Sequence, residues 1–292
     1  MSQNSTLSNS SIFLFGGLVV LVTIGLFAAI VLWPSGEKTQ PSEFVLGENA
    51  LAQTLNDEPT IQFLEVLHRV KPNAARKLNT QAEAAIETGA DKDDLAALVL
   101  ASYGSDFEDD YQHLMRADVK YLDGMMRMVQ RGLTTVSSGA PQYCKPAHYM
   151  KFEHMAPEEI THELASLFAH DSLGYRWGMQ FNSLLLEAIE SGRTSPKKYG
   201  RLNEADNQEL QKVLLRLMQS HQFAQLAMLQ TRSAEEQKSA AMTMNMCEMG
   251  KEVIGAFNTL PTETKARLLG GLQHQAKSGQ IERILREAQS QF

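Results

Sequence analysis

The feature that most constrains this chain is an apolar run without a charged side chain, residues 12–33, IFLFGGLVVLVTIGLFAAIVLW. As a helix rising about 1.5 Å per residue, it would span roughly 33 Å, enough to cross a hydrocarbon core of about 30 Å. Trp33 stands where interfacial aromatic residues belong, and Pro34 ends the helix just beyond it. The polar tail at 1–11 contains no Lys or Arg, which disfavours a cleaved signal peptide. The sequence therefore predicts a single transmembrane anchor.

Three small residues lie within this predicted anchor: Gly17, Gly25 and Ala29. Gly25 and Ala29 are four residues apart, and small residues at that spacing let two transmembrane helices approach closely. The pattern predicts self-association or a membrane partner. The alternative is that Gly and Ala are simply common in such helices.

The orientation of the anchor stays open in the sequence. Lys38 is the only basic side chain among the first 60 residues, so the positive-inside rule has almost nothing to count. By itself Lys38 favours a cytoplasmic C-terminal domain, whereas a disulfide between the two cysteines would require export. Our expectation is a single-pass protein of a bacterial inner membrane with a periplasmic soluble domain.

The rest of the chain shows helical periodicity and no convincing alternating strands. Residues 34–58 are expected to be a tether, and residues 59–292 an all-α soluble domain of about eight to ten helices. The first apolar stripe at helical spacing comprises Ile61, Leu64, Leu67 and Val70. The longest irregular stretch, 134–157, is a possible boundary between two closely packed units. No fixed internal period supports a repeat solenoid.

Several residues predict where helices begin or break. Asp91 is placed to cap a helix, and Ser233 with Glu236 three residues later forms a capping-box pattern. The second pattern is expected to open one long helix over 234–257. A break is expected near Asp171, since an uninterrupted helix through that point would be unusually long.

The charge is distributed unevenly along the chain. The whole sequence has 34 acidic and 27 basic side chains, a net charge of −7, which argues against a general nucleic-acid-binding protein. Residues 37–133 hold 17 acidic and 10 basic side chains, whereas residues 134–292 hold 17 of each. The acidic residues cluster at Asp91, Asp93, Asp94, Asp106, Glu108, Asp109 and Asp110. They predict a docking face for a basic protein partner, or alternatively a solvated face with favourable helix-end charges.

The loop at 134–157 contains a candidate metal site. Cys144, His148 and His154 supply soft and borderline ligands, although their spacing matches no zinc motif and a fourth ligand is missing. The alternative is a disulfide between Cys144 and Cys247. That bond would close a loop of roughly 100 residues and could stabilise the fold by about 4–5 kcal/mol in the chain-entropy model. It requires an oxidising compartment.

No nucleotide-binding, zincin or nucleophile-elbow motif is present in the sequence. We therefore assign no catalytic residue and expect no cofactor. A basic cluster, Lys197, Lys198 and Arg201 beside Tyr199, is too small for nucleic acid and would be a solvated loop or a contact with anionic lipid headgroups.

Taken together, these features predict a membrane-anchored helical interaction protein, such as an assembly factor, a scaffold or an accessory subunit of a membrane or envelope complex. The alternative is a membrane-anchored enzyme or metal-binding protein that uses the 134–157 loop.

Overall fold

A computed structural model describes residues 47, 49–104, 110–150, 155, 159, 167–224 and 233–277. Within these residues the chain is helical and contains no β-strand, which confirms the all-α class. The helices are α2 (Ala50–Leu55), α3 (Glu58–Val70), α4 (Pro72–Glu87), α5 (Lys92–Gly104), α6 (Tyr111–Leu114), α7 (Val119–Gly139), the 3₁₀ helix η2 (Pro141–Cys144), α8 (Pro146–Met150), α10 (Leu173–Thr194), α11 (Glu204–Gln219), α13 (Ala234–Thr243), α14 (Met246–Asn258) and α15 (Thr262–Lys277).

The predicted anchor at 12–33 lies outside the described residues. Among the helices that the structure does describe, none is both long enough and apolar enough to cross a membrane.

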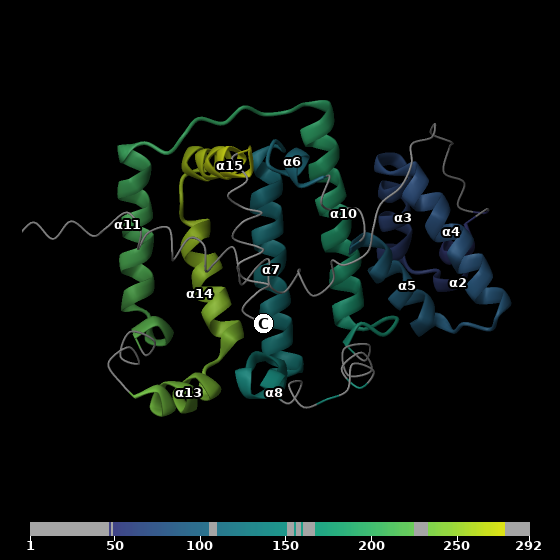
Figure 1. Cartoon of the computed structure of the whole chain (residues 1–292), viewed down its shortest axis with the longest axis horizontal. Helices are drawn as coiled ribbons and strands as arrows, with labels where there is room; N and C mark the ends of the chain where they lie inside the picture. The colour runs from purple at the N-terminus through teal and green to yellow at the C-terminus, as the bar shows by residue number, and fades with distance from the viewer. Residues whose placement is uncertain are drawn as a thin grey trace, which may run out of the picture.

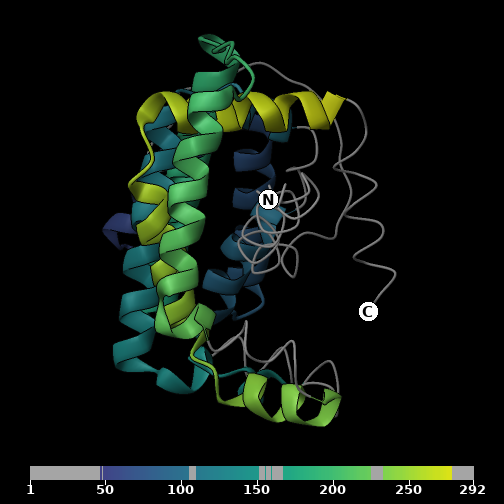
Figure 2. The ribbon, with the colours of Figure 1, turned by 90° about the vertical axis from the view of Figure 1, so that its left-hand side faces the viewer.

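The long helices stand side by side in a row (Figure 1). From one edge the order is α11, α14, α7, α10 and α3, with α2, α4 and α5 closing the other edge. α15 lies across one end of the row, and α13 and α8 lie at the opposite end. Figure 2 shows that α15 and α13 project to the same side of the row. Each long helix therefore packs mainly on the helices beside it.

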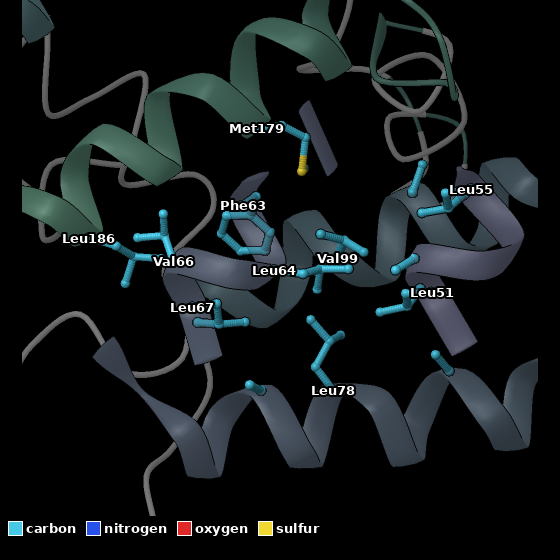
Figure 3. Packing of buried hydrophobic residues seen from close by; sticks show 14 of the residues in the cluster. Leu51, Leu55, Phe63, Leu64, Val66, Leu67, Leu78, Val99, Met179 and Leu186 are labelled. Carbon is cyan, nitrogen blue, oxygen red and sulfur yellow. The ribbon is translucent and has the colours of Figure 1, made fainter. Parts of the chain in front are cut away.

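The larger hydrophobic core joins α2, α3, α4, α5 and α10 (Figure 3). The predicted stripe on α3 is confirmed: Leu64, Leu67 and Val70 are buried, and Ile61 packs against the same core. α2 lies within the stretch expected to be a tether, yet its leucines Leu51 and Leu55 are fully buried in this core. The folded body therefore includes residues of the stretch 34–58 that was expected to be a tether.

A smaller core lies at the other edge of the row. It is formed by Val213 and Leu217 of α11, by Ala256 of α14, by Phe223 in the helical residues 221–224, and by Leu260 just after α14. α7 stands between the two cores and contacts α10 on one side and α14 on the other.

A close contact joins α7 to α10. The indole Nε1 of Trp177 donates to the carbonyl oxygen of Met128 at 3.0 Å. A Cβ at position 132 would lie 2.7 Å from that nitrogen, so Gly132 leaves the space that the indole needs. The side chain of Trp177 also stacks on Phe181, with ring centroids 5.2 Å apart.

The structure divides the helix expected at 234–257. Ser233 and Glu236 form the predicted capping contacts, since the Ser233 backbone nitrogen donates to a Glu236 carboxylate oxygen at 3.0 Å. The helix then stops, and Asn245 caps α14 by accepting from the backbone nitrogens of Cys247 and Glu248, both at 3.1 Å. Asn is a strong cap because its side chain replaces a missing intrahelical acceptor.

The stretch expected to be irregular at 134–157 also differs in its first part. α7 continues through it to Gly139, and η2 and α8 follow with short connections. Residues 134–139, which were expected to be irregular, are therefore the last turns of α7.

Candidate functional site

A cluster of polar side chains joins the first turns of α3, α5 and α10, with Thr60 and Tyr175 buried and Asp93 and Asp171 exposed. We call it the polar junction: Asp57, Thr60, Asp93, His170, Asp171 and Tyr175. The His170 side chain is 8% exposed and lies between two carboxylates. Its Nε2 is 3.2 Å from an Asp57 oxygen, and its Nδ1 is 3.3 Å from an Asp171 oxygen. Its backbone nitrogen donates to Asp93 at 2.7 Å. Three helix ends are thus held by one residue.

A chain of hydroxyl groups extends the polar junction inward. The hydroxyls of Tyr175 and Thr60 are in hydrogen-bond contact, and Thr60 Oγ1 lies 2.7 Å from Asp57 Oδ2. A carboxylate only accepts, so the single hydroxyl proton of Thr60 goes to Asp57 and Tyr175 donates to Thr60. Burial raises the pKa of Tyr175 far above its usual range, which keeps this donor protonated.

The backbone at the junction has the break expected near Asp171. Asp171 has φ of +65°, in the left-handed region, and Ser172 then caps α10 by accepting from the backbone nitrogen of Tyr175 at 3.0 Å. The Ser172 hydroxyl donates to the carbonyl oxygen of Leu167 at 2.8 Å. Both hydrogen bonds of the Ser172 hydroxyl therefore serve to cap the N-terminus of α10.

The chemistry of the polar junction follows from these contacts. A histidine acts as a general base through a ring nitrogen that faces the group to be deprotonated. Both ring nitrogens of His170 face carboxylates instead. The polar junction therefore joins helices and leaves no ring nitrogen for acid–base chemistry. No sequence pattern predicted it, because its members are up to 118 residues apart along the chain.

The two cysteines are bonded to each other in the structure. Cys144 at the end of η2 and Cys247 in the first turn of α14 form a disulfide across a sequence separation of 103 residues. Both residues are buried, at 1% and 4% exposed. The bond joins the turn after α7 to the start of α14.

The disulfide removes Cys144 from the candidate metal site. A cysteine binds metal as a thiolate, and Cys144 has no thiolate while it is bridged. His148 packs edge-to-face against Tyr143, with ring centroids 4.6 Å apart. His154 lies outside the described residues. Across the described part of the chain, no group of three or more His, Cys, Asp or Glu side chains is arranged to hold a metal ion.

One member of the predicted acidic face is internal. Asp110 is 1% exposed and forms ion pairs with Lys71, at the junction of α3 and α4, and with Arg193 of α10. It is therefore unavailable to a partner, and the prediction is corrected at this residue. Burying a carboxylate is tolerated here because two cations compensate its charge.

The remaining described members of the acidic cluster lie at the start of α5. Asp91 accepts from the backbone nitrogens of Asp93 and Asp94 at 2.8 and 3.0 Å, as the capping prediction required. All three are exposed, although Asp93 also holds His170 in the polar junction. The other members, Asp106, Glu108 and Asp109, lie outside the described residues, as do the small residues of the predicted anchor, Gly17, Gly25 and Ala29.

The outer face of α11 was not singled out by the sequence patterns. Leu215 is 61% exposed and Met218 is 41% exposed, although Val213 and Leu217 of the same helix are buried. α11 is the edge helix of the row and lies foremost in Figure 2. The sequence did contain an indication of this exposed face: the apolar residues of α11 are too many to lie on a single face of the helix.

An ion pair with a buried carboxylate joins α11 to α15. The Asp206 side chain, 1% exposed, accepts from Arg267 Nε at 2.6 Å and from the Thr264 hydroxyl at 2.8 Å. It also completes a capping box with Asn203. The hydrogen bonds from Arg267 are the main reason that the pKa of Asp206 falls to about 2.

The ion pair between Asp206 and Arg267 predicts how the stability of the fold depends on pH. Because the folded-state pKa of Asp206 lies below its unfolded value, its contribution to stability is fully present above about pH 4 and is lost as the pH falls towards 2. Asp206→Asn should lower the free energy of unfolding at pH 7 by about 2 kcal/mol and flatten the stability profile between pH 4 and 2. Urea denaturation at a series of pH values measures both effects. An unchanged acid limb in the variant would contradict the assignment.

Comparison of the chain with protein-family models, with curated proteins and with solved structures found no match.

Proposed function

We propose that this chain is a membrane-tethered helical interaction protein that serves as a scaffold, an assembly factor or an accessory subunit of a membrane or envelope complex. The observation that carries the proposal is the exposed apolar face of α11, where Leu215 and Met218 lie three residues apart. Residues at this spacing share a helix face. The neighbouring side chains Gln208 and Gln211 are polar but uncharged, and Lys212, three residues before Leu215, is paired with Glu209 at 2.7 Å. A partner can cover such a face without burying an unpaired charge.

The polar junction supports a non-catalytic role. Its histidine, the side chain best suited to acid–base work, is held by Asp57 and Asp171 and ties three helices together. The polar junction fixes α3, α5 and α10 relative to one another, and a fixed arrangement of helices presents its surface in one orientation. Preorganised surfaces bind more tightly because less conformational entropy is lost.

The proposed location is the inner membrane of a bacterium, with the helical body in the periplasm. The apolar run at 12–33 supports the anchor, and the Cys144–Cys247 bond supports an oxidising compartment. The exposed carboxylates of Asp91 and Asp94 would favour a basic partner. Close packing of anchors would add self-association in the membrane.

The role of α11 can be tested with the full chain extracted from membranes in a mild detergent. The wild-type chain is expected to migrate as a complex with a partner or a second copy, and Leu215→Lys with Met218→Lys is expected to release it as a monomer. Light scattering coupled to size exclusion measures the protein mass. The matched control is Leu173→Lys, because Leu173 is 63% exposed but lies at the start of α10. A wild-type chain that is already monomeric would overturn the proposal.

A further inference from the structure

The connection between α10 and α11, residues 195–203, runs along the end of the row that α15 crosses (Figure 1). Its cationic side chains Lys197, Lys198 and Arg201 are exposed, and so is the adjoining Leu202, at 36%. We call these four residues the basic loop. It combines positive charge with an apolar side chain on the surface.

The backbone of this connection is held in place. The Lys197 nitrogen donates to the carbonyl oxygen of Arg116 at 2.8 Å, and the Tyr199 hydroxyl donates to the carbonyl oxygen of Ala117, also at 2.8 Å. A Cβ on Gly270 of α15 would overlap the carbonyl oxygen of Gly200. The cations therefore project from a fixed support, unlike those of an unconstrained solvated loop.

The charges around the basic loop leave an excess of cations. Arg116, whose carbonyl oxygen accepts from Lys197, adds a fourth cation to this part of the chain. Two acidic residues adjoin the basic loop. A carboxylate oxygen of Asp118 lies 3.8 Å from Lys197 Nζ, and Glu204 is the first residue of α11.

The other acids at this end of the row face cations, including Glu263 of α15, which interacts with Arg267. Asp206 is paired with Arg267, and Asp110 is paired with Lys71 and Arg193. The whole chain has a net charge of −7, so this positive surface is confined to one end of the molecule. An anionic partner is therefore favoured at this end.

We infer that the basic loop docks on the anionic headgroups of the membrane that holds the chain's own anchor. This inference rests on the proposed tether. The stretch between the anchor and α2 has about 16 residues, which reach at most about 58 Å when extended. α7, which spans the height of the row, has 21 residues and is therefore about 32 Å long. Either end of the row is thus within reach of the bilayer, which is always present at high local concentration.

The energetics suit reversible docking. Each Lys or Arg near an anionic surface favours binding about fivefold, so the three cations of the basic loop together contribute on the order of a hundredfold. Leu202 is placed to enter the headgroup region beside them. In docking, the row would lie with its α15 end against the membrane and its α11 face still accessible to a partner.

The test uses the full chain in lipid nanodiscs. Leu202→Cys introduces a single labelling site, because both native cysteines are bridged. An environment-sensitive fluorophore at this position is expected to shift to the blue in discs with about a third anionic lipid, but not in purely zwitterionic discs. High salt is expected to reverse the shift, since about 1 M salt reduces the screening length to about 3 Å.

The variant Lys197→Ser, Lys198→Ser, Arg201→Ser should lower the equilibrium constant for docking on the order of a hundredfold. The matched control, Lys77→Ser, Lys92→Ser, Arg127→Ser, removes the same charge from three exposed cations elsewhere and should dock normally. Identical fluorescence in both kinds of disc would overturn the inference, as would a shift that appears only when an acidic protein is added. If the chain leaves the discs once detergent is removed, the tether itself fails; if it stays without sensing lipid charge, only the docking fails.

Discussion

Removing the Cys144–Cys247 disulfide is expected to lower the free energy of unfolding by about 4–5 kcal/mol. The bond closes a loop of 103 residues between η2 and α14. In the chain-entropy model, a longer closed loop restricts the unfolded chain more strongly and so stabilises the fold more. Cys144→Ala with Cys247→Ala should show this loss in urea denaturation followed by circular dichroism. Most small domains are only about 5–15 kcal/mol stable, so the variant would be near its folding limit.

The single variants provide the control for this prediction. Cys144→Ala and Cys247→Ala should each cost nearly as much as the double variant, because either one breaks the same bond. Chain isolated from membranes with an alkylating reagent present should contain no modified cysteine. Two alkylated thiols would contradict both the bond and the periplasmic location.

The second large effect is expected at Gly192, where α10 passes the end of α6. A Cβ at this position would overlap the carbonyl oxygen of His113 and lie 3.2 Å from the backbone nitrogen of Ala117. Both atoms belong to the backbone, so no side-chain rotation relieves the overlap. Gly192→Ala should therefore cost about 3 kcal/mol of stability, measured as a lower urea midpoint with an unchanged slope.

Gly271→Ala is the matched control for this substitution. Gly271 lies within α15, and nothing comes within 4 Å of a Cβ built there. Alanine has a higher helix propensity than glycine, so this variant should gain up to about 1 kcal/mol. Equal destabilisation by the two substitutions would show that helix backbone effects, and not the approach of α6, control the result.

Local helix signals carried most of the fold that could be predicted. The cap at Asp91, the capping box at Ser233 and the break at Asp171 all depend on side chains within a few residues of the backbone groups they satisfy. The break before α14 was missed because a continuous apolar pattern masked the competing cap at Asn245. α2 was missed because six residues are too few to show a helical period.

The site residues were less predictable because their roles depend on distant partners. Asp110 looked like part of an exposed acidic run, but Lys71 and Arg193 meet it from other helices. His170 carried no motif, and its importance comes from Asp57 and Asp171 on either side of its ring. Neither environment can be read from neighbours in sequence.

The sequence by itself determined the all-α class, the helix caps at Asp91 and Ser233 and the two alternative states of Cys144, and it predicts the anchor at 12–33, because these follow from composition and short-range periodicity. Only the tertiary structure decided that Cys144 is bridged to Cys247, that Asp110 is internal, and that α11 forms the edge with Leu215 and Met218 exposed. Pairing and burial arise from contacts between segments that the chain brings together over about a hundred residues, and no local pattern encodes which segments those are.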